Sequence, residues 1–236
     1  IAEGEQTDIS MNGFSVLDGE TRWRFVRRGP DFWTGEYSLV AEDGSLIALP
    51  LPRDAGFEAV LDGHVIANMN SLQVSSAGWS APMGALVAWS LADIAAGRSV
   101  APTVIFRPSE TQAVEDVAAS ETKLWVKVLD DVSGKLIELT PGAEGWAQRT
   151  MDLPANSTIQ IAETSGKGDT AFVTVESMLT PPTLYAVPSD GAPEAIASEP
   201  AQFDAGKFTV EQKFAISKDG TKVPYYLVRP AGAEGP

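Results

Sequence analysis

The feature that most constrains the fold is a repeat of about 50 residues. Four short apolar segments recur at nearly even spacing, with centres near residues 39, 87, 137 and 185 and steps of 48, 50 and 48 residues. They are Tyr37–Val40, Ala85–Trp89, Lys135–Leu139 and Thr183–Val187. A fixed period of this length indicates a repeat architecture, because each unit is one supersecondary element that buries its faces on its neighbours.

Further strand signals surround each recurring segment. Runs of β-branched, aromatic and aliphatic residues alternate with clusters of Gly, Pro, Asp and Ser, which is the pattern of strands joined by turns. Good helix formers are concentrated only in Leu91–Gly97. In the second repeat, the strand before the recurring segment is Val65–Met69, and it is separated from that segment by more residues than in the other repeats. The other predicted strands are Thr21–Arg28, Glu36–Ala41, Ser45–Leu49, Thr103–Arg107, Lys123–Leu129 and Ala171–Val175.

Four strands in each unit of about 50 residues is the periodicity of β-propeller blades. A β-sandwich also consists of short strands and turns, but its strands would not repeat at this even spacing. About four blades fit between Thr21 and Asp204. We therefore predict an all-β chain whose residues 1–204 form a partial β-propeller of about four blades.

Seven blades would need on the order of 350 residues. We therefore expect the chain, which opens at Ile1 and stops at Pro236, to be a segment of a longer product.

The tail, residues 205–236, departs from the repeat. Two alternating strands, Phe208–Ile216 and Lys222–Arg229, flank a turn at Ser217–Thr221. The turn contains Asp219-Gly220, a strong hairpin signal because both positions tolerate a positive φ. We predict a hairpin that opens a second domain.

Several segments together carry a family resemblance. In the tail these are Val210–Gln212, Ser217–Pro224 and Leu227–Pro230, and just upstream lies Ser177–Tyr185. They resemble the junction between propeller and hydrolase domains, and the last blade before it, in prolyl oligopeptidases. More loosely, the segments Arg22–Gly29, Leu91–Ile94 and Val128–Val132 are similar to bacterial members of that family.

The resemblance implies a serine-type prolyl endopeptidase with a seven-bladed propeller and an α/β-hydrolase domain. Residues 205–236 would then be the junction and first β-hairpin of a truncated hydrolase domain. The expected partners are short proline-containing peptides and that missing domain, and the propeller would restrict access to the active site. The family's catalytic residues lie beyond the equivalent of Pro236, so none is assigned in this chain.

The residues themselves also argue against catalysis. An α/β-hydrolase needs Gly-x-Ser-x-Gly followed by an acid and a histidine, whereas this chain lacks that motif and has one histidine, His64, which we interpret as structural. There is no cysteine. We assign no catalytic, cofactor-binding or metal-binding residue and expect no cofactor. Three adjacent acidic pairs fit solvated turns: Glu42-Asp43, Glu115-Asp116 and Asp130-Asp131. The segment Ser165–Asp169 lacks the spacing of a phosphate-binding loop, so we interpret it as a β-turn.

Aromatic and basic residues also favour structural roles. Trp33, Trp79, Trp89, Trp125 and Trp146 are spread over successive repeats, which favours packing between blades over a ligand-stacking platform. In the segment from Arg22 to Arg28 we expect Trp23 and Phe25 to point inward while Arg22 and Arg24 are solvated.

Charge limits the partners. The chain carries 32 acidic and 17 basic side chains, a net charge of −15, so nucleic acid and anionic membranes would be repelled. No apolar run approaches the ~18 residues that span a bilayer. We expect a soluble protein of the cytoplasm or periplasm. The unpartnered blade faces and strand edges of a partial ring predict a homo-oligomer.

Two alternatives stay open. A free-standing β-propeller that binds proteins or ligands would have no hydrolase domain after Pro236. A related hydrolase with acylaminoacyl-peptidase or oligopeptidase B-like specificity would differ only in pocket residues that this chain does not contain.

Overall fold

The structure is a computed structural model that describes residues 4–76, 78–99 and 101–233. It contains four antiparallel sheets of four strands each, which we call blades 1 to 4, followed by a two-stranded hairpin. Blade 1 consists of β1 (Ser10–Asp18), β2 (Thr21–Gly29), β3 (Glu36–Val40) and β4 (Leu46–Ala48). Blade 2 consists of β5 (Gly56–Leu61), β6 (His64–Asn68), β9 (Leu86–Ser90) and β10 (Thr103–Phe106).

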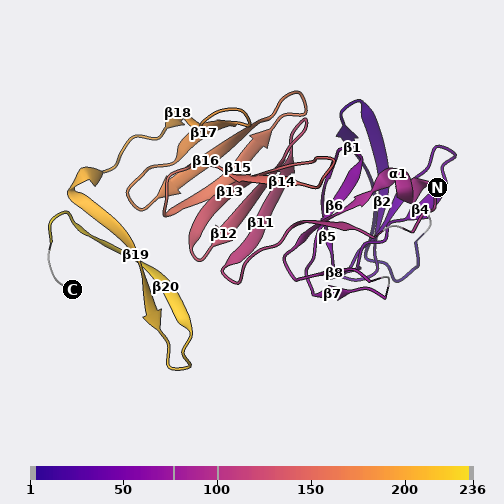
Figure 1. Ribbon diagram of the computed structural model, residues 1–236, viewed down its shortest axis with the longest axis horizontal. Helices are drawn as coiled ribbons and strands as arrows, with labels where there is room; N and C mark the ends of the chain where they lie inside the picture. The colour runs from indigo at the N-terminus through magenta and orange to yellow at the C-terminus, as the bar shows by residue number, and fades with distance from the viewer. Residues whose placement is uncertain (1–3, 77, 100, 234–236) are drawn as a thin grey trace.

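Blades 3 and 4 follow without insertions. Blade 3 consists of β11 (Gln112–Ala119), β12 (Leu124–Asp130), β13 (Ser133–Thr140) and β14 (Ala147–Thr150). Blade 4 consists of β15 (Ser157–Thr164), β16 (Thr170–Ser177), β17 (Thr183–Pro188) and β18 (Glu194–Ser198). Figure 1 shows the blades in chain order, from the indigo sheet on the right to the orange sheet on the left.

The predicted repeat is confirmed, because the four recurring segments fall on β3, β9, β13 and β17, the third strand of each blade. Within a blade, consecutive strands pair side by side and antiparallel. The first blade begins at Ser10, earlier than the expected limit at Thr21, because its first strand was not recognised in the sequence.

Blade 2 contains the insertions that disturbed the repeat. A small hairpin of β7 (Gln73–Val74) and β8 (Ser80–Ala81) lies between its second and third strands, which explains the long gap after Val65–Met69. Helix α1 (Leu91–Ala95) follows β9 and is capped by Ser90, whose side chain accepts a hydrogen bond from Asp93 N. Within the described residues, no helix is long and apolar enough to cross a membrane.

Apolar clusters join each blade to the next. The first cluster, between blades 1 and 2, includes a ring of aromatic contacts in which Phe25 lies 5.3 Å from Phe14 and 5.1 Å from Phe57 between ring centroids. The second joins blades 2 and 3, and the third joins blades 3 and 4 around the fully buried Trp125. Each blade therefore depends on its neighbours, as the repeat predicted.

The expected orientation of β2 is confirmed: Phe25 is buried and Trp23 packs on the first cluster, while Arg22 and Arg24 are exposed. Four of the five tryptophans assigned to packing also lie in or against the clusters, namely Trp79, Trp89, Trp125 and Trp146. Trp33 is the exception, at 88% exposed.

A close backbone approach between blades 3 and 4 gives a first prediction. A Cβ atom at Gly134 would lie 2.9 Å from Ser157 O and 3.0 Å from Ile159 N, so the backbones would have to separate. We expect Gly134→Ala to destabilise the protein by about 1 to 3 kcal/mol. Chemical unfolding measures this. In the matched control, Gly166→Ala, the added Cβ meets nothing within 4 Å, and equal losses in both variants would contradict the described packing.

Candidate functional site

The surface of interest is lined by the first strands of the four blades. These axial strands, β1, β5, β11 and β15, contact one another in chain order. Their side chains that are not buried between blades are largely polar or acidic and include Glu58, Glu115, Asp116, Gln160 and Glu163. The arrangement forms one wall of a propeller's axial passage.

Three of the axial strands carry an irregularity at similar positions. Their pairing registers shift around Glu58 in β5, Glu115 in β11 and Ala162 in β15. A bulge increases local twist and re-aims a side chain. Burial raises the pKa of Glu58, and the nearby carboxylate of Asp116 on the next axial strand raises it further.

One end of the passage is formed by the turns that follow the axial strands, and we call it the turn mouth. It is lined by Asp18–Glu20, Asp62–Gly63, Ser120–Thr122 and Ser165–Lys167. A hollow of about 720 Å³ touches blades 1 to 4, and an adjacent one of about 450 Å³ touches blades 1 to 3. The predicted turn Ser165–Asp169 lies here, between β15 and β16.

Asp18 joins blades 1 and 2 at the turn mouth. Its carboxylate accepts hydrogen bonds from Asp62 N at 2.9 Å and Gly63 N at 2.7 Å. Those two residues form the β5–β6 turn with positive φ values of 50° and 69°, as expected for an Asp-Gly hairpin turn. The carboxylate thus satisfies turn amides that would otherwise require water.

Asp169 joins blades 3 and 4 in the same way. Its carboxylate accepts hydrogen bonds from Ser120 Oγ at 2.7 Å, Thr122 N at 2.8 Å and Thr122 Oγ1. Ser120 Oγ in turn accepts a 3.0 Å hydrogen bond from Trp125 Nε1. Burial acts to raise the pKa of Asp169, but the hydrogen bonds from Thr122 and Ser120 outweigh it and lower the pKa.

The structure brings together three residues that sequence reasoning did not connect. Ser90 lies opposite His64 across the β6–β9 pair, and Asp93 lies on the helix that Ser90 caps. Serine, histidine and aspartate are the residue types of a hydrolase triad.

Their hydrogen bonds assign them to local structure. Ser90 Oγ accepts from Asp93 N at 3.2 Å, and His64 Nδ1 lies 2.6 Å from the carbonyl of Asp62. Arg98 binds the Asp93 carboxylate and lowers its pKa. The histidine is therefore oriented by a turn carbonyl and the acid is paired with an arginine, so the geometry is that of a helix start.

The expectation that the three acidic pairs lie in turns is wrong for Glu115-Asp116, which lie inside β11 where the pairing register shifts. Within the described parts of the chain, no group of three or more His, Cys, Asp or Glu side chains could hold a metal ion. Glu115 pairs with Lys127 at 3.1 Å, and Asp130 accepts hydrogen bonds from Thr111 and Gln112. Asp43 accepts from Ser45 N in the β3–β4 turn.

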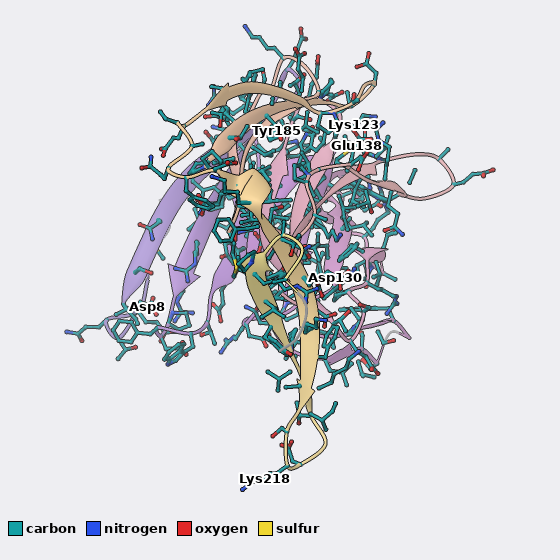
Figure 2. The ribbon with its side chains drawn as sticks, turned by 90° about the vertical axis from the view of Figure 1, so that its left-hand side faces the viewer. Asp8, Lys123, Asp130, Glu138, Tyr185 and Lys218 are labelled. Carbon is teal, nitrogen blue, oxygen red and sulfur yellow. The ribbon has the colours of Figure 1, made fainter. Side chains whose placement is uncertain are left out.

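The opposite end of the blades carries the terminal hairpin of β19 (Phe208–Ile216) and β20 (Lys222–Pro230). The Tyr226 hydroxyl donates a 3.0 Å hydrogen bond to Val132 O in the β12–β13 turn. Figure 2 shows the hairpin passing Asp130 and reaching away from the sheets to its tip at Lys218. Several of its apolar side chains are exposed, among them Phe214, Ile216, Val223, Tyr225 and Val228.

Comparison with protein families gives a match to the N-terminal β-propeller domain of prolyl oligopeptidase over residues 58–198. An uncharacterized peptidase of Sinorhizobium fredii, y4nA, is 34% identical over 235 residues, which are 97% of this chain and 32% of that protein. An uncharacterized peptidase of Rickettsia prowazekii, RP174, is 24% identical and covers 88% of this chain and 30% of its own length. The chain thus spans about a third of the length of these relatives.

Solved structures show the same fold. A post-proline cleaving enzyme from Rickettsia typhi superposes with a TM-score of 0.81 and 21% identity over 99% of this chain and 35% of its own. Oligopeptidase B from Leishmania major superposes with a TM-score of 0.64 and 18% identity over 95% of this chain and 32% of its own.

Proposed function

Because the chain belongs to the prolyl oligopeptidase family, in which it matches the N-terminal β-propeller domain, we propose that it is the non-catalytic, access-controlling part of a serine peptidase that cuts short proline-containing peptides. The observation that carries the proposal is the set of four blades around an axial wall, with turns at one end and the terminal hairpin at the other.

Access control follows from the geometry of such a wall. A peptide that reaches a catalytic domain at the hairpin end must either pass along the axial strands or enter when the two domains separate. Both routes favour short, extended peptides over folded proteins, so selectivity by size arises without any bond chemistry in the propeller.

The terminal hairpin supports a domain boundary near residue 205. We assign residues 1–204 to the propeller and residues 205–236 to the junction and first hairpin of an α/β-hydrolase domain. A two-stranded hairpin is marginally stable in water, and this one exposes Ile216 at 69% and Val223 at 45%. Further elements of a hydrolase domain would cover those side chains, and the Tyr226–Val132 hydrogen bond would hold the junction against blade 3.

The proposal is tested with the longer polypeptide that contains this chain. We expect it to hydrolyse a short chromogenic peptide after proline and to leave the same proline site uncut within a long, unfolded polypeptide. Deleting the propeller while keeping the hydrolase domain should increase the ratio of long-substrate to short-substrate cleavage. An unchanged ratio, with the remaining domain still active and folded, would contradict access control.

The alternative of a free-standing binding module makes the opposite prediction. In that case the reading frame after Pro236 would contain no Gly-x-Ser-x-Gly motif followed by an acid and a histidine. Proline-peptide hydrolysis would then be absent from the longer polypeptide as well.

A further inference from the structure

Among the four blades, blade 2 has the longest connection between its second and third strands, residues 69–85, which we call the insertion. Clusters of buried side chains join this blade to blade 1 on one side and to blade 3 on the other. Both neighbouring blades are thus in place. The side chains that the insertion still exposes are therefore open to whatever lies over the end of the blades.

The base of the insertion is built into the blade. Ala81 is fully buried in the cluster between blades 1 and 2, and Trp79 packs edge-on against Trp89 with 6.0 Å between the ring centroids. The Asn70 amide donates a 2.6 Å hydrogen bond to Asp54 O, in the segment that joins the two blades. These contacts hold the insertion in one place on the blade.

The tip of the insertion exposes apolar side chains. Gln73 in β7 pairs with the buried Ala81 in β8, so Gln73 faces the blade. Its neighbours Leu72 and Val74 face away, because successive strand residues point to opposite faces. Leu72 is 67% exposed, Val74 75% and Met83 68%, and we call these three side chains the apolar tip. A group of large apolar side chains held in solvent is typical of an interaction surface.

The apolar tip lies at the same end of the blades as the terminal hairpin. β6 begins at His64, beside the turn mouth, and ends at Asn68, so the insertion leaves blade 2 at the opposite end. The β12–β13 turn of blade 3 is at that end too, and its Val132 O accepts the hydrogen bond from Tyr226. Figure 1 shows β7 and β8 below the sheets, on the side to which β19 and β20 extend.

We propose that the apolar tip is a contact surface for the hydrolase domain that follows the terminal hairpin. This rests on the proposed function, which supplies that domain. The side chains of Leu72 and Val74 have no polar group, so they fit an apolar area on the surface of a folded domain. The contact continues the junction that Tyr226 already makes on the neighbouring blade.

The position of the apolar tip gives the contact a role in closure. The chain leaves the propeller after blade 4, and Tyr226 bonds to blade 3, so the connection lies on those two blades. The apolar tip lies on blade 2, away from that connection. When the two domains separate, the contact at the apolar tip breaks while the covalent connection stays. The apolar tip therefore favours the closed state, in which long substrates are excluded.

Thiol labelling of the longer polypeptide measures whether the apolar tip is covered. One variant carries Val74→Cys, and the matched control carries Ala143→Cys in the exposed β13–β14 turn, at the turn-mouth end of blade 3. Peptide mass spectrometry gives the labelling rate at each position. We expect labelling about tenfold slower at position 74, because only the open fraction of molecules reacts there. This readout does not require enzymatic activity.

A second variant of the longer polypeptide weakens the contact. Leu72→Glu combined with Val74→Glu would bring two carboxylates into an apolar contact, which is unfavourable without partners. We expect the ratio of long-substrate to short-substrate cleavage to rise about tenfold, with the KM for the short peptide unchanged. The matched control Ala143→Glu should leave the ratio unchanged, and circular dichroism verifies folding of each variant.

Equal labelling rates at positions 74 and 143 would overturn the inference, and so would an unchanged cleavage ratio in the double-glutamate variant. A raised KM for the short peptide with an unchanged ratio would make the apolar tip a substrate contact. Protection of position 74 that disappears on dilution, as a doubled mass falls in light scattering, would make it a contact between copies. Either result also overturns the inference.

Failure of the proposed function would look different. Position 74 would be protected in a longer polypeptide that cuts no proline-containing peptide. The contact at the apolar tip would then stand, and the assignment of the second domain as a prolyl peptidase would be wrong.

Discussion

Replacing Trp125 with alanine should lower the free energy of unfolding by about 3 to 5 kcal/mol, the range for removing a buried large aromatic side chain. Trp125 is fully buried between blades 3 and 4 and donates to Ser120 Oγ. Its loss creates a cavity and also removes a donor from the network that ends at Asp169. Urea unfolding followed by circular dichroism measures the change.

Trp33→Ala is the matched control for this prediction. The Trp33 side chain is 88% exposed, so its removal should change stability by no more than about 0.5 kcal/mol. If the two variants lost similar stability, the packing of blade 3 on blade 4 through Trp125 would be wrong.

Asp169→Ala should cost about 2 to 3 kcal/mol at neutral pH, because hydrogen bonds to a charged group are among the stronger ones and removal leaves Thr122 N and Thr122 Oγ1 without the carboxylate that accepts from them. The pKa of Asp169 is lower in the folded protein than in the unfolded chain, where it is about 3.9. Its contribution is therefore fully present above that value and is lost as the pH falls through the lower, folded-state pKa.

The difference in unfolding free energy between the unaltered protein and Asp169→Ala should accordingly shrink as acid is added. Asp190→Ala, in the exposed β17–β18 turn, provides the matched control with little effect at any pH. A difference for Asp169→Ala that stayed constant from neutral pH into the acid range would show that its charge does not hold blades 3 and 4 together.

The third strands and the terminal hairpin were predictable because their sequences follow simple rules. Lys135–Leu139 and Thr183–Val187 are short apolar runs bounded by turn residues, and they became β13 and β17. The hairpin was predicted at Phe208–Ile216 and Lys222–Arg229 and found at Phe208–Ile216 and Lys222–Pro230, because its strands alternate strictly around Asp219-Gly220.

Three of the four axial strands, β5, β11 and β15, were missed for a physical reason. A bulge adds one residue to a strand, so the alternation of buried and exposed side chains changes phase within it. In β11 the register shifts between Val114 and Asp116, and in β5 it shifts between Phe57 and Ala59. One face of these strands also lines the axial passage, which permits acidic residues where a buried strand would have apolar ones.

The turn mouth could not be derived from the sequence because its contacts join distant positions. Asp18 bonds to residues 44 and 45 positions later, and Asp169 bonds to residues 47 and 49 positions earlier. The two aspartates also occupy different places: Asp18 ends the axial strand β1 before its turn, whereas Asp169 follows the turn after β15 and directly precedes β16.

The central claim, an access-controlling propeller without catalytic groups of its own, is tested most directly by assaying this 236-residue chain and the longer polypeptide on one short chromogenic proline peptide. We predict turnover by the longer polypeptide and none by the chain alone. Turnover by the chain alone that disappears in His64→Ala, its only histidine, would contradict the claim.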